Sequence, residues 1–166
     1  MNNKIMKIAL GGVLSAVILL ATIAFPIPLP NHMGFINFGD GVIFGVSSIL
    51  GPFAAIVAAL GSALSDYLLG YAIYIPATAL IKGCMGLLAG LVLRRSPKLP
   101  WYLMIVLFAG CELIMVGGYF LYESLLYGVS AAIITVPGNL MQGLAGIILG
   151  LAIVPLVRKV KSLINL

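Results

Sequence analysis

The chain has 166 residues, of which 63% are hydrophobic and only 8% are charged, with a formal net charge of +5. Soluble domains are about 45–50% apolar and about 25% charged, so this composition excludes an ordinary soluble domain and indicates an integral membrane protein. The apolar runs are continuous rather than alternating, which excludes a transmembrane β-barrel. We therefore expect a single all-α domain over residues 1–166, embedded in the lipid bilayer. We expect no nucleic-acid partner, because membrane topology accounts for the basic residues.

The chain contains six consecutive apolar segments. A helix needs about 20 residues to cross the membrane fully. A proline-rich stretch, residues 25–30, ends the first segment. The Gly51-Pro52 pair is a turn signal and divides the run from Gly39 to Gly70 into two short helices. Pro137 lies in the last segment, where it either starts the helix or kinks it. The expected spans are approximately residues 5–25, 39–50, 53–70, 76–95, 101–122 and 129–157.

The basic residues decide between five spans and six. Eight of the nine fall in three clusters, and the positive-inside rule places all three clusters on the cytoplasmic face. This placement requires two crossings between residues 39 and 70. The sequence therefore predicts six transmembrane helices with cytoplasmic N and C termini. The clusters are Lys4 and Lys7; Arg94, Arg95 and Lys98; and Arg158, Lys159 and Lys161.

Lys82 lies in the middle of an apolar span, where an unpaired cation costs several kcal/mol. At 1.5 Å per helical residue, Lys82, Glu112 and Gln142 lie roughly 18, 21 and 24 Å above the nearest basic cluster, in the outer half of the membrane. Three helices thus bring a cation, a carboxylate and an amide to a similar depth. The sequence favours a polar pocket open to the outside, and the rival interpretation is a buried structural pair of Lys82 with Glu112.

Further polar residues share helical faces with these groups. Tyr119 and Glu123 recur with Glu112 at i+7 and i+11, and Asn139 precedes Gln142 by three residues. The two remaining acids have ordinary interpretations. Asp40 follows Gly39 and is predicted to cap a helix N-terminus, and Asp66 is predicted near an outer helix end.

Two spans carry similar sequences, LIKGCMGLLAG at residues 80–90 and LMQGLAGIILG at residues 140–150. In this alignment Lys82 matches Gln142, and three glycines match in each segment. Each polar side chain then stands beside a glycine face that permits close helix packing. Weak internal repeats are common in transporters, with sites between the repeated elements. Chance is the alternative, because glycines are abundant in such helices.

Small residues in the first span are spaced by four, Gly11 with Ser15 and Gly12 with Ala16. Such faces allow another helix to approach closely. The residues alone leave open internal packing, which the spacing favours, and docking to a separate membrane subunit. The two cysteines, Cys84 and Cys111, lie in apolar runs without metal or redox spacing and are predicted to pack in the core.

Residues 26–38 form a loop with three prolines and the only histidine, His32. The apolar content of the loop indicates that it folds back over the protein as a lid. A lone loop histidine is more often a surface residue than a ligand. The chain shows no catalytic His/Asp or Cys/His set, no zinc-protease motif and no phosphate-binding loop. We therefore expect no enzyme activity, no cofactor and no metal.

The stretch from residue 35 to 90, which begins FINFGDGVIFG, resembles the substrate-binding S components of energy-coupling factor (ECF) vitamin transporters. The resemblance extends over nearly the whole chain, including the small residues of the first helix and the Pro-Gly-Asn-x-x-Gln of residues 137–142. It is nearest to the riboflavin, hydroxymethylpyrimidine and pyridoxine branch. It implies a six-helix protein of the bacterial plasma membrane that captures one vitamin from outside. The implied partners are a transmembrane coupling subunit and two cytoplasmic ATPase subunits.

The resemblance also implies a pocket in the outer half of the membrane, between the fourth, fifth and sixth helices and under the loop after the first. The candidate substrate-binding residues are then Lys82, Glu112, Tyr119, Asn139 and Gln142, with Asn37 and His32 from the lid. Gly12 and Ala16 would meet the coupling subunit. The family usually has Ala-xxx-Ala at this face, whereas this chain has Gly-xxx-Ala.

A pocket with a cation, carboxylates and amides suits a small polar heteroaromatic compound that stacks on Tyr119 or Tyr122. We expect pyridoxine or another B6 vitamer first and hydroxymethylpyrimidine second. Riboflavin would need a larger aromatic wall than the single tryptophan, Trp101, which is predicted at the inner edge. The alternative function is a self-sufficient ion-coupled secondary transporter that uses Glu112 or Asp66 as a proton site.

Overall fold

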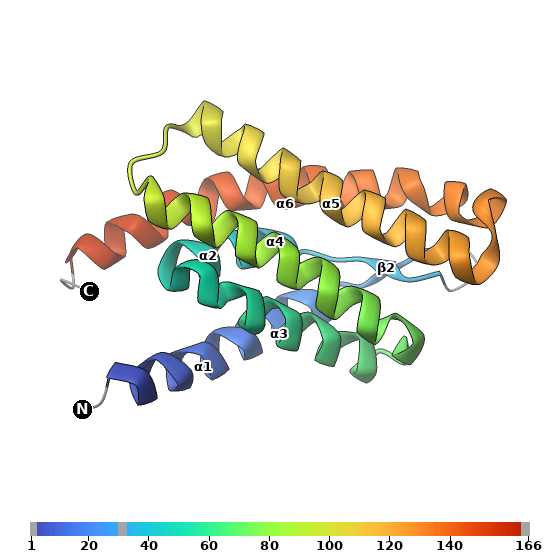
Figure 1. Ribbon diagram of the computed structural model, residues 1–166, viewed down its shortest axis with the longest axis horizontal. Coiled ribbons are helices and arrows are strands. Elements are labelled where there is room, and N and C mark those ends of the chain that lie inside the picture. Colours follow the sequence, from blue (N-terminus) through green and yellow to red (C-terminus); the bar gives the residue numbers. More distant parts are fainter. Residues whose placement is uncertain (1–2, 30–32, 164–166) are drawn as a thin grey trace.

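The computed structural model describes residues 3–29 and 33–163, which form a bundle of helices with one small β-hairpin (Figure 1). The strands β1 (Ile27–Pro28) and β2 (Phe35–Ile36) pair antiparallel within the predicted lid. Two short 3-10 turns, η2 (Gly51–Phe53) and η3 (Ala72–Tyr74), join helices. The α-helices are α1 (Asn3–Ile23), α2 (Gly39–Leu50), α3 (Ala54–Leu68), α4 (Ile75–Arg95), α5 (Trp101–Tyr127) and α6 (Val129–Leu163).

Contacts between helices fix their directions. Gly41 and Gly45 of α2 pack against Leu149 and Ile153 of α6, so these two helices run parallel. The chain then reverses at Gly51, whose positive φ of 59° is readily adopted by glycine, and α3 runs back antiparallel to α4 (Figure 1). Residues 39–68 therefore make two passes through the bundle, with the reversal at the predicted Gly-Pro turn.

The described chain contains five helical stretches that are long and apolar enough to cross a membrane. Residues Gly39–Leu68 count as one of the five by length and composition, although they contain the reversal at Gly51. Helix α5 continues five residues beyond its predicted end, and α6 runs on to Leu163. Helix α6 begins at Val129, so Pro137 lies inside it and does not start it.

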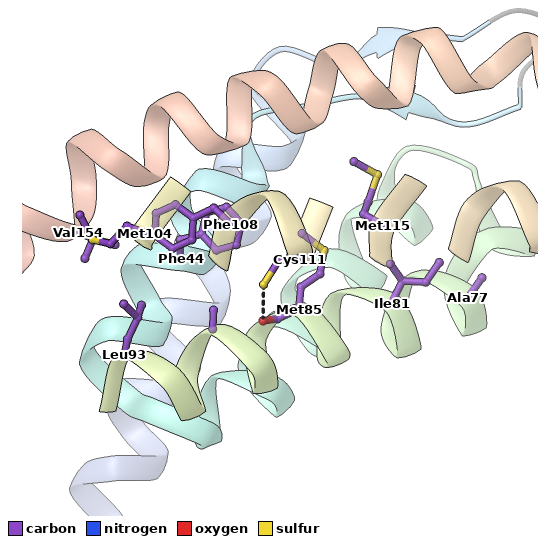
Figure 2. Close-up of a cluster of buried hydrophobic side chains, with 11 residues drawn as sticks. Phe44, Ala77, Ile81, Met85, Leu93, Met104, Phe108, Cys111, Met115 and Val154 are labelled. Atoms are coloured by element: carbon purple, nitrogen blue, oxygen red, sulfur yellow. Dashed lines mark hydrogen bonds between the residues drawn. The ribbon is translucent and has the colours of Figure 1, made fainter. Parts of the chain in front are cut away.

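Two clusters of buried apolar side chains hold the helices together. The larger cluster joins α2, α4, α5 and α6, and within it the rings of Phe44 and Phe108 stack with their centroids 4.1 Å apart (Figure 2). Cys111 is buried there and donates to the backbone carbonyl of Met85. The prediction for Cys84 is wrong, because this cysteine lies on an exposed face of α4. The smaller cluster joins α1, α2 and α3.

Candidate substrate-binding site

A cavity of about 440 Å³, including its mouth, lies between the lid and helices α3 to α6. The lid contributes Leu29, Met33 and Phe35, and Leu29 packs against Gly138 of α6. The loop thus covers the cavity as the sequence predicts. The polar side chains that line the cavity are Thr22, Asn37, Ser62, Asp66, Thr78, Lys82, Tyr119, Glu123, Asn139 and Gln142.

A buried polar network forms the inner boundary of this cavity. Lys82 Nζ donates to Asp40 Oδ1 at 2.5 Å, and Gln142 Nε2 donates to Asp40 Oδ2 at 2.6 Å. The backbone and side-chain amides of Asn37 both donate to Gln142 Oε1, at 3.0 and 3.2 Å. Asn37 Oδ1 in turn accepts from the backbone amide of Gly39. These bonds connect the base of the lid to α2, α4 and α6.

Asp40 is the main correction to the predicted site. Phe38 is the N-cap residue of α2, and the side chain that accepts from the start of this helix is that of Asn37, from the Gly39 N–H. Asp40 is instead fully buried and carries the negative charge that pairs with Lys82. The rival interpretation, a structural pair of Lys82 with Glu112, is therefore wrong. The sequence signal was present, because Asp40 is the only ionisable residue in an otherwise apolar segment. Its position next to Gly39 made a cap the simpler interpretation.

The two similar segments meet at the same carboxylate. Lys82 and Gln142, which match in the alignment, each bind one oxygen of Asp40. The glycines beside them also allow close approach, but to different partners. Gly86 and Gly90 of α4 lie against the backbone of α3 and η2, whereas the glycines of α6 lie against side chains of α2 and α5. The repeat therefore places two donors on either side of α2.

Glu112 does not line the cavity. It is 4% exposed and lies between α5 and α6, against Gly143 and Gly146. Neither carboxylate oxygen has a hydrogen-bond partner in the described part of the chain. The structure thus places Glu112 outside the cavity lining, near Asp40 and beside the glycines of α6. Lys82, Tyr119, Asn139, Gln142 and Asn37 do come together around the cavity.

Aromatic side chains form one wall of the cavity. Tyr119 bonds to Thr78 at 2.9 Å, and Lys82 Nζ lies 5.7 Å from the centroid of the Tyr119 ring. Tyr74 packs near Tyr119, with centroids 6.4 Å apart, and Tyr71 packs near Phe35 of the lid at 5.1 Å. The sequence prediction missed Tyr71, Tyr74 and Phe35, because helix periodicity gives no orientation for residues in loops and short turns.

Two buried polar atoms at the cavity have no partner among the described residues. They are Asp66 Oδ2, on a side chain that is 5% exposed, and Asn139 Nδ2, on a side chain that is 4% exposed. One is an acceptor and the other a donor. Leaving such an atom unpaired costs about 1–3 kcal/mol, so both are suited to a polar ligand. Asp66 was predicted near an outer helix end and, in the alternative function, as a proton site, but not as a substrate-binding residue.

The remaining predicted residues lie away from the cavity. On α1, Gly11 and Ser15 pack against α3, whereas Gly12 and Ala16 are exposed on the outer face, and no atom lies near the position of a Gly12 side chain. The face with Gly11 and Ser15 thus packs inside the bundle, and the face with Gly12 and Ala16 points outward. His32 lies outside the described residues.

These features define a class of membrane protein in which a helical bundle surrounds a polar cavity under a lid. A family model described as the ECF-type riboflavin transporter, S component, matches residues 2–159. The chain belongs to this family, which confirms the resemblance seen in the sequence. It is therefore an integral protein of the plasma membrane and a component of a vitamin transporter, not an enzyme.

Two relatives match most of the chain. One is an uncharacterized protein in a gap 3' region of Pyrococcus woesei, which is 31% identical over 132 residues, 79% of this chain and 87% of the relative. The other is the thiamine precursor transporter HmpT of Lactococcus lactis subsp. cremoris. It is 29% identical over 160 residues, 95% of this chain and 91% of the relative.

Proposed function

We propose that this chain captures the hydroxymethylpyrimidine precursor of thiamine from outside the cell, as the binding subunit of an ATP-driven ECF importer. The observation that carries the proposal is the unpaired donor and acceptor, Asn139 Nδ2 and Asp66 Oδ2, in a cavity with an aromatic wall. The pyrimidine has an amino group that donates and ring nitrogens that accept, so it can pair with both atoms. Its flat ring suits the face of Tyr74 or Tyr119.

This order of vitamins differs from the one expected from the sequence alone, which placed pyridoxine first. The similarity to a thiamine precursor transporter supports a pyrimidine. Pyridoxine has a ring nitrogen and hydroxyl groups but no amino group, and it is the second candidate.

We further propose six membrane spans with both termini in the cytoplasm. In the bundle α2, α4 and α6 run one way and α1, α3 and α5 the other, and both ends of the chain lie at the same end of the molecule (Figure 1). Basic residues from all three sequence clusters gather at that end. The positive-inside rule then directs the cavity and its lid to the outside.

The coupling subunit and the two ATPase subunits are proposed partners. Exposed Gly12 and Ala16 on α1 leave a shallow face on which a helix of the coupling subunit can pack closely. No phosphate-binding loop is present in the sequence, so the energy of ATP must come from other subunits.

The vitamin is tested by calorimetric titration of the purified protein with hydroxymethylpyrimidine, pyridoxine and riboflavin. We expect hydroxymethylpyrimidine to bind most tightly. Asn139→Ala and Asp66→Asn are each expected to weaken binding about tenfold, the loss of roughly one hydrogen bond. Leu140→Ala, on the exposed face of α6, is the matched control and is expected to bind normally. Tighter binding of pyridoxine or riboflavin would refute the choice of vitamin, and unchanged affinity in both site variants would refute the site.

The importer role is tested in liposomes that contain only this chain. We expect no accumulation of the vitamin under a proton or sodium gradient, and ATP-dependent accumulation once the coupling and ATPase subunits are added. Gradient-driven uptake by the chain alone would favour the alternative of a secondary transporter.

A further inference from the structure

A second pocket lies at the end of the bundle opposite the vitamin cavity. Four basic side chains line it, and they come from α1, α4, the α4–α5 loop and α6: Lys7, Arg94, Lys98 and Arg158. Residues that are 151 positions apart in the sequence, Lys7 and Arg158, thus meet around one opening. The positive-inside rule explains why basic residues occur at this end, but not why one pocket gathers members of all three clusters.

These four cations have no carboxylate partner in the described part of the chain. The ion pair found among the described residues joins Lys82 to Asp40, in the other half of the molecule. Arg158 donates through Nη1 to the backbone carbonyl of Leu99 at 3.3 Å, while its Nη2 is buried and unpaired. Like charges that share a pocket repel one another, so an anion placed among them would remove both the repulsion and the unpaired donor.

The backbone holds at least one of these side chains in position. The stem of Arg94 packs on Gly51, where a side chain would come within 3.0 Å of the Arg94 Cδ atom. Gly51 ends α2, and the negative end of that helix favours a nearby cation. Lys7 Nζ lies 5.0 Å from the centroid of the Phe53 ring, and Arg158 bonds to the Leu99 carbonyl, but none of the four cations is paired with a carboxylate in the described part of the chain.

We propose that this pocket binds the phosphodiester headgroup of an anionic phospholipid from the cytoplasmic leaflet. The wall of the pocket is apolar below the charges, with Ile49, Leu50 and Leu93, and suits the glycerol and upper acyl chain of a lipid. Trp101 and Tyr102 are 67% and 55% exposed at the start of α5, next to the loop that carries Lys98. Exposed Trp and Tyr mark the headgroup level of a membrane, and basic pockets between transmembrane helices at the cytoplasmic side suit anionic headgroups.

The bound lipid would connect the ends of α1, α4 and α6 with the turn between α2 and α3. It would therefore stabilise the bundle at the end away from the vitamin. The proposal uses the orientation proposed above only to choose the leaflet, and it does not depend on which vitamin binds.

The test is thermal unfolding of the purified protein in detergent, without vitamin, after addition of phosphatidylglycerol, phosphatidylcholine or inorganic phosphate. Native mass spectrometry of the same samples counts the bound lipids. We expect phosphatidylglycerol to raise the unfolding temperature and to remain bound, whereas phosphatidylcholine and phosphate have little effect. Each neutralised charge is expected to weaken phosphatidylglycerol binding about fivefold, so the effect should nearly vanish in the triple variant Arg94→Gln, Lys98→Gln, Arg158→Gln.

The matched control is Arg95→Gln, which removes an exposed charge beside the pocket but not in it. It is expected to keep the response to phosphatidylglycerol, and vitamin binding is expected to remain normal in all variants as evidence of folding. Equal responses to phosphatidylglycerol and phosphatidylcholine, or an equal loss in Arg95→Gln, would overturn the proposal. An equal response to inorganic phosphate would show a free-anion site instead. If phosphatidylglycerol fails to bind but the triple variant no longer assembles with the coupling and ATPase subunits, the pocket is a protein-docking surface.

Discussion

Asp40 carries a negative charge in a fully buried position, and each of its oxygens accepts from a donor on a different helix. Burying two charges costs desolvation free energy. Their attraction offsets this cost only when the two groups are in contact and their remaining donors and acceptors are hydrogen-bonded. Lys82 supplies the opposite charge, and Gln142 supplies the second donor. The pair is therefore a structural element of the bundle as well as a boundary of the vitamin cavity.

Removal of either charged partner alone should be costly. Lys82→Ala is expected to destabilise the protein by about 3–5 kcal/mol, because it leaves Asp40 buried without a counter-charge. The double variant Lys82→Met, Asp40→Asn removes both charges and is expected to recover most of that loss. Thermal unfolding in detergent measures the effect, with Arg95→Ala as an exposed control. The single variants Lys82→Met and Asp40→Asn complete the comparison. If their losses of stability simply add in the double variant, Lys82 and Asp40 do not act as a pair.

At this scale the sequence indicated which residues share a level of the bundle but not their rotation about the helix axis. Lys82 and Gln142 both bind Asp40 and, with Asn139, line the cavity. Glu112 has a similar depth, but the close contact of α5 with the glycines of α6 turns it out of the cavity. Tyr74 and Asp66 lie where helices end, and their direction depends on how the turn between α3 and α4 folds. Such orientations follow from packing between helices, which one sequence does not contain.

Helix α4 shows how glycines set the distance between elements. At Gly90 a side chain would lie 2.2 Å from the carbonyl oxygen of Gly51, and at Gly86 it would lie 2.8 Å from that of Ala54. These contacts are with backbone atoms, which cannot move aside as a flexible side chain can. Gly83, one turn earlier, has no atom closer than 3.5 Å.

This difference predicts opposite effects for the same substitution in one helix. Gly90→Ala should separate α4 from the turn at Gly51 and destabilise the protein by about 1–3 kcal/mol. Gly83→Ala should be neutral or stabilise by up to about 1 kcal/mol, because alanine is the better helix former. Unfolding temperatures of the two variants measure the contrast. Similar values would show that α4 does not depend on the close approach at Gly90.

The helices and their turns could be predicted from the sequence more completely than the residues of the site. The division of residues 39–70 rested on two independent signals, the Gly51-Pro52 turn and the requirement that three basic clusters lie on one face. The structure reverses the chain at Gly51. The ends of α5 and α6 were placed too early, because hydropathy falls before the backbone hydrogen bonds end. The strands of the lid are two residues each and leave no periodic pattern.

For the whole molecule, the proposed topology makes opposite predictions for two loops. In a background with Cys84→Ala, Ser130→Cys near the start of α6 should react in intact cells with a membrane-impermeant maleimide. Ser96→Cys, between α4 and α5, should react only after the membrane is permeabilised. Cys111 is buried and should stay unlabelled in both cases. Labelling of Ser96→Cys from outside would require the opposite orientation or a different number of spans.

We expect the shortness of α2 to limit the size of the cargo. Helix α2 has 12 residues, about 18 Å, and begins close to the level of Lys82 and Gln142. From that level α4 continues outward for seven residues and α6 for thirteen, about 10 and 20 Å. Among the described residues none of α2 lines the cavity, which lies between the lid and these longer helices. Each turn added to the start of α2 would extend this helix toward the cavity by about 5 Å. We therefore expect a longer α2 to restrict the protein to smaller molecules.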